Sequence, residues 1–116
     1  MKKQVVIEMR YTSCFWVKTD KVKYSVANTH PKKMSIGKIT ELIPPWDLVN
    51  DYKKGIINDN DYKEVYMKQL ESLGVTKILE LIPDNSIICC WEKKGFCHRH
   101  LIAEFLGEEY MIELEG

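Results

Sequence analysis

Near the end of the chain, Cys97-His98-Arg99-His100 follows a short loop after Glu92. A thiol in an electropositive setting is a nucleophile, and an imidazole exchanges protons near neutral pH. A guanidinium binds phosphate or carboxylate through paired hydrogen bonds. We therefore predict catalytic roles for Cys97, His98 and Glu92. Arg99 is the predicted ligand for an anionic group.

The surrounding residues indicate a buried strand, a turn and then a helix. Segment 86–92 is mostly apolar, and segment 97–106 carries apolar residues at helical spacing before a glycine. A helix N-terminus presents unpaired backbone N–H groups and a partial positive charge. Such an end favours a thiolate and binds anions, so the pattern predicts an anion-binding junction with Cys97 as a candidate nucleophile.

Successive residues of a helix are rotated by about 100°. This rotation places His98 in the middle of the apolar side, with Cys97 and Arg99 at the border of a cleft. His100 points towards solvent. Glu92 is expected to orient His98 or to neutralise Arg99.

A purely structural explanation of the same residues remains open. Cys97 is then a small buried residue, and His98 is a core histidine that hydrogen-bonds a backbone carbonyl. Arg99 and Glu92 form an ordinary ion pair in that case. Short motifs alone do not separate the two explanations.

The strands and helices expected along the chain alternate. Strands separated by helices are typical of an α/β fold, here a small, mostly parallel sheet with helices on its faces in a single three-layer domain over residues 1–116. The continuous apolar run in 87–91 favours a central strand. The expected strands are 4–11, 23–27, 86–91 and 110–114, and the expected helices are 44–54, 58–73, 75–81 and 97–106.

Parallel strands bring their carboxyl ends to one edge of the sheet, where ligands of open α/β folds bind. Residues 11–14 and 28–30 and Glu92 are expected there, beside the start of the last long helix. Tyr11 and Ser13 then complete the floor of the ligand site.

Composition narrows the function classes. The 116 residues are 45% hydrophobic and carry 17 basic and 17 acidic side chains, so the net charge is zero. Nothing in this balance indicates binding to a polyanion by bulk charge. Two local lysine groups remain as possible basic patches: Lys18, Lys21 and Lys23, and Lys32, Lys33 and Lys38.

The four cysteines are Cys14, Cys89, Cys90 and Cys97. No signal-peptide pattern and no apolar run of about 18 residues is present, so we expect a cytoplasmic protein with free thiols and no membrane association. No paired Cys-x-x-Cys occurs, and we assign no metal ligands and no cofactor.

Segment 88–106 resembles the signature of the DUF488 family: an apolar strand ending in an acidic residue, a short loop, then Cys-His-Arg and a helix. The short bacterial and phage members look similar along almost the whole chain. The resemblance implies a small cytosolic α/β domain and marks Glu92, Cys97, His98 and Arg99 as the site. It implies no established reaction. The Thr-Ile-Gly-His opening of longer members is replaced here by residues 11–14.

The leading hypothesis is a protein that binds a phosphate-bearing or nucleotide-like anionic ligand at this junction, with or without Cys97 and His98 chemistry. The alternative is a non-enzymatic module that binds nucleic acid or a protein partner through lysines and the exposed aromatics Phe15, Trp16 and Trp46. A third hypothesis is a metal-binding Cys/His protein. Enzymatic activity and oligomeric state stay open.

Overall fold

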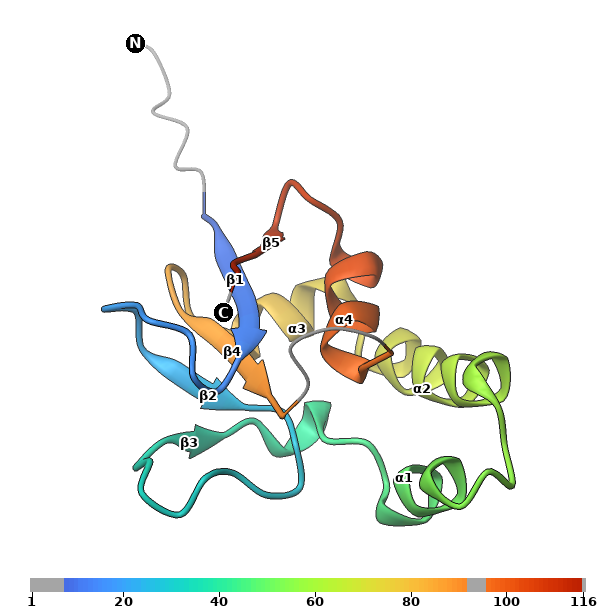
Figure 1. The fold of residues 1–116 in the computed structure, drawn as a ribbon. Helices are drawn as coiled ribbons and strands as arrows, with labels where there is room; N and C mark the ends of the chain where they lie inside the picture. Colours follow the sequence, from blue (N-terminus) through green and yellow to red (C-terminus); the bar gives the residue numbers. More distant parts are fainter. Residues whose placement is uncertain (1–7, 92–95, 116) are drawn as a thin grey trace, which may run out of the picture.

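The computed structural model describes residues 8–91 and 96–115, which form an α/β domain around a parallel five-stranded sheet (Figure 1). The strand order is β3-β2-β4-β1-β5, and every pair of neighbours is parallel. The elements are β1 (Arg10–Cys14), β2 (Lys23–Ser25), β3 (Gly37–Lys38), the 3-10 helix η1 (Thr40–Leu42), α1 (Trp46–Lys53), α2 (Asp59–Leu73), α3 (Val75–Leu81), β4 (Ile87–Cys90), α4 (His98–Leu106) and β5 (Met111–Glu113).

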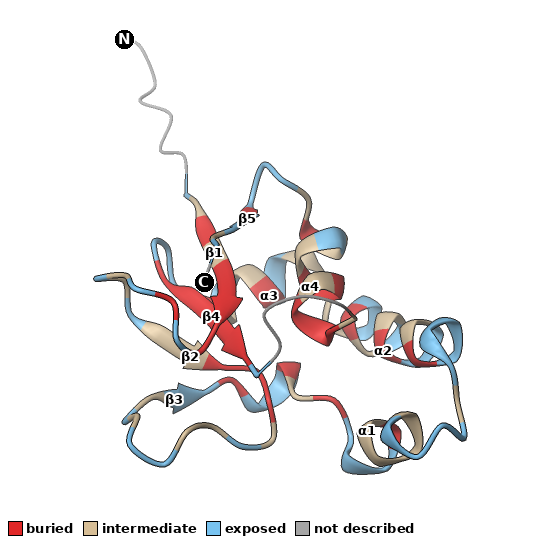
Figure 2. Ribbon diagram, in the orientation of Figure 1, coloured by how far each residue is buried: buried red, intermediate tan, exposed pale blue. Residues whose placement is uncertain are grey.

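The central strand β4 is buried along its whole length, as its continuous apolar sequence predicts (Figure 2). Alternation along the strand sends Ile88 into the larger core, which includes buried side chains from α1, α2, α3 and α4. Ile87 and Cys89 belong to a second core on the opposite face. Loop residues 15–17 and 34–36 contribute to that second core, so a layer of loops covers this face.

Local interactions bound the longest helix, α2, at both ends. The side chain of Asn58 accepts a hydrogen bond from the backbone N–H of Asp61 at 2.9 Å, and the Asp61 carboxylate accepts one from the N–H of Asn58 at 3.1 Å. Gly74 ends the helix with φ of 83°, a conformation that glycine adopts without steric cost.

The first strand lies further along the chain than its sequence predicts. Residues 11–14 belong to the strand itself, and β1 pairs with β4 from Tyr11 opposite Ile87 to Cys14 opposite Cys90. The expected segment 4–7 lies outside the described residues. The elements β3 and η1 are not predicted, because two or three residues are too short to show a periodicity.

The carboxyl ends of neighbouring strands meet at one edge, as predicted. The indole N–H of Trp91, just after β4, donates to Thr29 Oγ1 at 3.0 Å, and its ring centroid lies 5.2 Å from that of Phe15. His98 at the start of α4 hydrogen-bonds Val26, which follows β2. None of the helices in the described part of the chain has the length and apolar character that a membrane span requires.

Candidate functional site

A pocket of about 140 Å³ opens at this carboxyl edge, between the ends of β2 and β4 and the helices α1, α2 and α4. Its position matches the ligand-binding edge of open α/β folds. The described residues that line it are Ala27, Asn28, Thr29, Pro44, Trp46, Val49, Tyr52, Lys53, Tyr62, Trp91, Phe96, Cys97 and His98.

Aromatic rings dominate one wall of the pocket. The ring centroids of Tyr52 and Tyr62 are 5.3 Å apart, and each lies 5.2 Å from that of Phe96. Trp46 and Trp91 also line the pocket and remain 59% and 40% exposed. This wall offers flat apolar surfaces that favour a planar ligand.

Polar groups line the rest of the pocket. The side-chain amide of Asn28 donates to the carbonyl of Pro44 at 3.4 Å, and Thr29 accepts from Trp91. Lys53 is the last residue of α1. Among the described lining residues, it is the one that is a lysine or an arginine. The pocket therefore combines a flat apolar wall with one cation.

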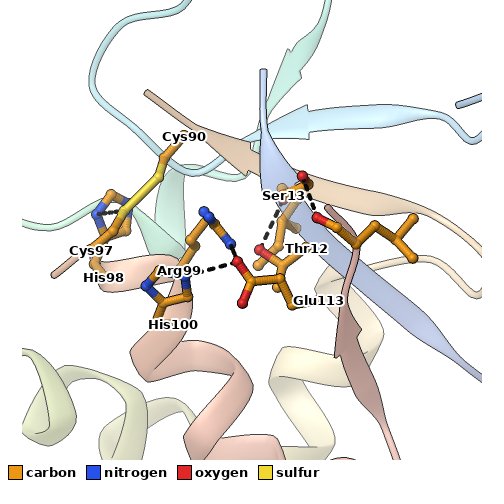
Figure 3. Close-up of polar contacts among 10 residues, drawn as sticks. Thr12, Ser13, Cys90, Cys97, His98, Arg99, His100 and Glu113 are labelled. Atoms are coloured by element: carbon orange, nitrogen blue, oxygen red, sulfur yellow. Dashed lines mark hydrogen bonds and ion pairs between the residues drawn. A yellow bond between two sulfur atoms is a disulfide. The ribbon is translucent and has the colours of Figure 1, made fainter. Parts of the chain in front are cut away.

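His98 lies beside Cys97 (Figure 3), and a single contact of its buried ring fixes its protonation. Its Nε2 hydrogen-bonds the carbonyl oxygen of Val26, and a carbonyl oxygen only accepts. Nε2 must therefore carry the proton, which leaves Nδ1 of the neutral ring as an acceptor. That Nδ1 lies 3.8 Å from Sγ of Cys97.

Burial, with a smaller contribution from the neighbouring charge of Arg99, lowers the pKa of His98 to about 4 against the opposing effect of the hydrogen bond to Val26. The ring is therefore neutral at pH 7. The hydrogen bond of His98 to the Val26 carbonyl is the contact expected if His98 is a purely structural core residue. The unprotonated Nδ1 beside Cys97 is the arrangement that proton transfer from a thiol requires.

Cys97 is the N-cap residue of α4, and its sulfur is joined to that of Cys90, the last residue of β4. The prediction of free thiols is wrong for this pair. The two residues are seven positions apart, and the end of β4 and the start of α4 bring their sulfurs together. The prediction is confirmed for Cys14 and Cys89, which are free and buried. Burial raises the pKa of the Cys89 thiol to about 11.

Arg99 is fully buried and does not belong to the described lining of the pocket. Its Nη1 donates to Glu113 Oε1 of β5 at 3.0 Å, and Nε2 of His100 lies 3.1 Å from the same oxygen. Burial alone would raise the pKa of Glu113, but the hydrogen bonds from His100 and Arg99 outweigh it and the pKa is lowered. Glu113 was not predicted as a partner, because it follows no motif and lies on the last strand.

The other predicted site residues lie elsewhere. Ser13 Oγ donates to the carbonyl of Leu114 at 2.6 Å, and the ring of Tyr11 lies 4.3 Å from Lys21 Nζ. Neither residue is among the described lining of the pocket. Glu92 lies outside the described residues.

Burial tests the exposed aromatic residues of the alternative hypothesis. Phe15 is fully buried, because it packs in the second core against the sheet, so that hypothesis is wrong for this residue. Trp16 and Trp46 are exposed, as that hypothesis requires. Within residues 8–91 and 96–115, no three His, Cys, Asp or Glu side chains are grouped as metal ligands.

The chain matches a known family model. Residues 13–110 match the family model DUF488-N3a, described as the active DUF488-N3 subclade. No curated protein and no solved structure matches the chain significantly. The match covers most of the chain and includes the Cys-His-Arg segment. The chain therefore belongs to the DUF488 family.

Proposed function

We propose that this protein binds a small ligand with a planar ring and an anionic group, such as a nucleotide, in the pocket at the carboxyl edge of the sheet. Cys97 and His98 are its chemical groups. The observation that carries the proposal is that one pocket joins an aromatic wall to both of these residues. The ring of the ligand stacks on the wall, and the reactive part lies over the start of α4.

The cation that meets the anionic group in this proposal is Lys53. Arg99 as an anion ligand stays a prediction of the sequence, but its guanidinium already bonds the Glu113 carboxylate away from the described pocket lining. Lys53 lines the pocket directly. The start of α4 adds the partial positive charge of a helix N-terminus as a second source of positive potential.

The chemistry follows from the two partners of the His98 ring. With Nε2–H bonded to Val26, Nδ1 is positioned to accept a proton from the thiol form of Cys97. The low pKa of His98 keeps the pair uncharged at rest. A bound anion stabilises the imidazolium and so promotes this transfer, which activates Cys97 when the ligand is present. His98 thus acts as a base.

Fluorescence titration of the reduced protein tests the proposal, since Trp46 and Trp91 line the pocket. The probes are adenosine and uridine 5′-monophosphates, with the bare nucleosides and ribose 5-phosphate as controls. The nucleotides are expected to bind at least tenfold more tightly than either control. Absence of saturable binding by every probe would refute the proposal.

Lysine variants locate the anion. Lys53→Met is expected to weaken nucleotide binding about tenfold, equivalent to about 1.4 kcal/mol, and to leave nucleoside binding unchanged. Lys54→Met is the matched control, because Lys54 follows on the same helix end and is exposed. Equal affinities for the two variants would remove Lys53 as the anion partner.

The second candidate is binding of single-stranded nucleic acid, favoured by the neighbouring exposed rings of Trp16 and Trp91, whose centroids are 5.6 Å apart. Two lysines of the basic groups already donate hydrogen bonds within the protein. Lys23 Nζ donates to the carbonyl of Phe15, and Lys38 Nζ donates to that of Asn28. An affinity for oligonucleotides that falls steeply with salt supports this candidate. No oligonucleotide binding at low salt would eliminate it.

A further inference from the structure

The two sulfurs of Cys90 and Cys97 link the end of β4 to the start of α4 at the pocket. All four cysteines of the chain lie in the described residues, and among them only Cys97 lines the pocket. Cys90, Cys14 and Cys89 are completely buried. A small thiol that enters the pocket therefore reaches the disulfide at Cys97.

The bond also determines what Cys97 can do. In the disulfide, the sulfur has no proton to give to Nδ1 of His98, 3.8 Å away, and no lone thiolate with which to attack a ligand. Reduction restores both properties at the N-cap of α4, where the positive end of the helix favours a thiolate. The same sulfur thus has an inert and a reactive form.

We propose that Cys90 and Cys97 are a reversible redox pair that switches the reactive residue of the pocket off when oxidised and on when reduced. The inference rests on the proposed function, because it makes thiol–disulfide exchange the control of that site. Its chemistry requires only a small thiol as co-reactant.

The exchange balances in two steps. A thiolate of a small thiol attacks Sγ of Cys97, the bond to Cys90 breaks, and Cys90 leaves as a thiolate that takes up a proton. A second thiol attacks the mixed disulfide on Cys97, which releases the Cys97 thiol and a disulfide of the two small thiols. Two electrons and two protons pass to the protein. A low-molecular-weight disulfide reverses both steps.

Differential alkylation with mass spectrometry tests the pair. Protein oxidised with a small disulfide and then freed of it is treated with iodoacetamide while folded, and with N-ethylmaleimide after unfolding. We expect neither Cys90 nor Cys97 to be labelled. After treatment with dithiothreitol and its removal, Cys97 is expected to react with iodoacetamide in the folded protein at least ten times faster than Cys14 or Cys89.

Variants give the matched controls. In Cys90→Ala, no internal thiol resolves a mixed disulfide on Cys97, so the oxidised variant is expected to retain the mass of the small thiol on Cys97, which the oxidised wild type does not carry. In Cys89→Ala, which alters the adjacent residue of β4, the redox dependence of labelling is expected to persist. Labelling of Cys90 and Cys97 by either reagent in the oxidised wild type would overturn the proposal, because the bond would be absent.

The readout is separate from the proposed function. Nucleotide titration of the reduced protein tests ligand binding, and alkylation tests the bond. A reduced protein that binds no nucleotide but shows the labelling pattern above defeats the proposed ligand and supports the redox pair. Redox-independent labelling with normal nucleotide binding defeats the redox pair alone.

Discussion

The first turn of α4 has two halves with different surroundings, although its residues are consecutive. Cys97 and His98 line the pocket. Cys97 is bonded to Cys90 at the end of β4, and His98 hydrogen-bonds Val26, which follows β2. Arg99 and His100 instead meet Glu113 of β5 on the far side of β1.

The cause of this division is the rotation of about 100° per helical residue. Cys97, the N-cap residue, and His98, the first residue of α4, face the β2 end of the sheet, and Arg99 and His100 face the β5 end. A contiguous motif is therefore not a contiguous site. In the proposed function, the Cys97–His98 half supplies the reactive atoms. The Arg99–His100 half contacts Glu113 and so links α4 to the last strand.

The largest expected effect lies in the Arg99 half. Arg99→Ala removes a completely buried side chain and separates Glu113 from its cation, so we expect the free energy of unfolding to fall by about 3 kcal/mol. Urea denaturation measures this. Lys68→Ala, which removes a surface pair with Glu64, is the control and is expected to cost less than about 0.5 kcal/mol. A small loss for Arg99→Ala would contradict the structural role of this half.

The next effect is the pH dependence that His98, in the pocket half, gives to the stability of the protein. The pKa of His98 is about 4 when folded, against an ordinary value of 6.5, so between these two pH values the unfolded chain binds a proton that the folded chain does not. Stability then falls by up to about 3 kcal/mol as the pH is lowered from 6.5 to 4.

The control for this pH dependence is His98→Gln, whose amide N–H retains a donor for Val26 but does not titrate. We expect its stability to depend less on pH over that window, as measured by urea denaturation at a series of pH values. Identical pH profiles of variant and wild type would mean that His98 is not held neutral by burial.

The smallest effect concerns Glu113, the half-exposed partner of Arg99 in the ion pair. Glu113→Gln is expected to reduce stability at pH 7 by about 1 kcal/mol, because one carboxylate oxygen serves both Arg99 and His100. The pKa of Glu113 is lowered, so its contribution is complete above the usual carboxyl range and is lost as the pH falls through the lowered value.

Thermal unfolding at pH 7 and at pH 3 checks the Glu113 prediction. The difference between wild type and Glu113→Gln is expected to shrink at the lower pH. Glu104→Gln is the matched control, since Glu104 pairs with the exposed Lys63 on the surface. A Glu113→Gln effect no larger than that of Glu104→Gln would remove the ion pair as a support of α4.

The sequence predicts the helices better than the partners of the site. Asn58 and Gly74 bound α2 because capping and positive φ are local properties. The apolar periodicity of segment 97–106 correctly places His98 inward. These features depend on residues within one or two helical turns.

Contacts between distant segments are different. Glu113 meets Arg99 because β5 pairs with β1 beside α4, and Cys90 meets Cys97 because a strand ends where a helix begins. Cys90 and Cys97 are only seven positions apart, and their contact depends on where β4 ends and α4 begins. The strand order decides the contact of Glu113 with Arg99, and no residue pattern encodes that order. Arg99 was therefore expected in the pocket, whereas Lys53 was not singled out.

The most direct test of the divided motif is the imidazole ¹H–¹⁵N spectrum of the reduced protein, which has only three histidines. At pH 7, His98 is expected to show a neutral ring protonated at Nε2. Saturating adenosine 5′-monophosphate is expected to shift the signals of His98 and to leave those of His100 unchanged. A shift confined to His100, or equal shifts of both rings, would contradict the assignment of the ligand to the Cys97–His98 half.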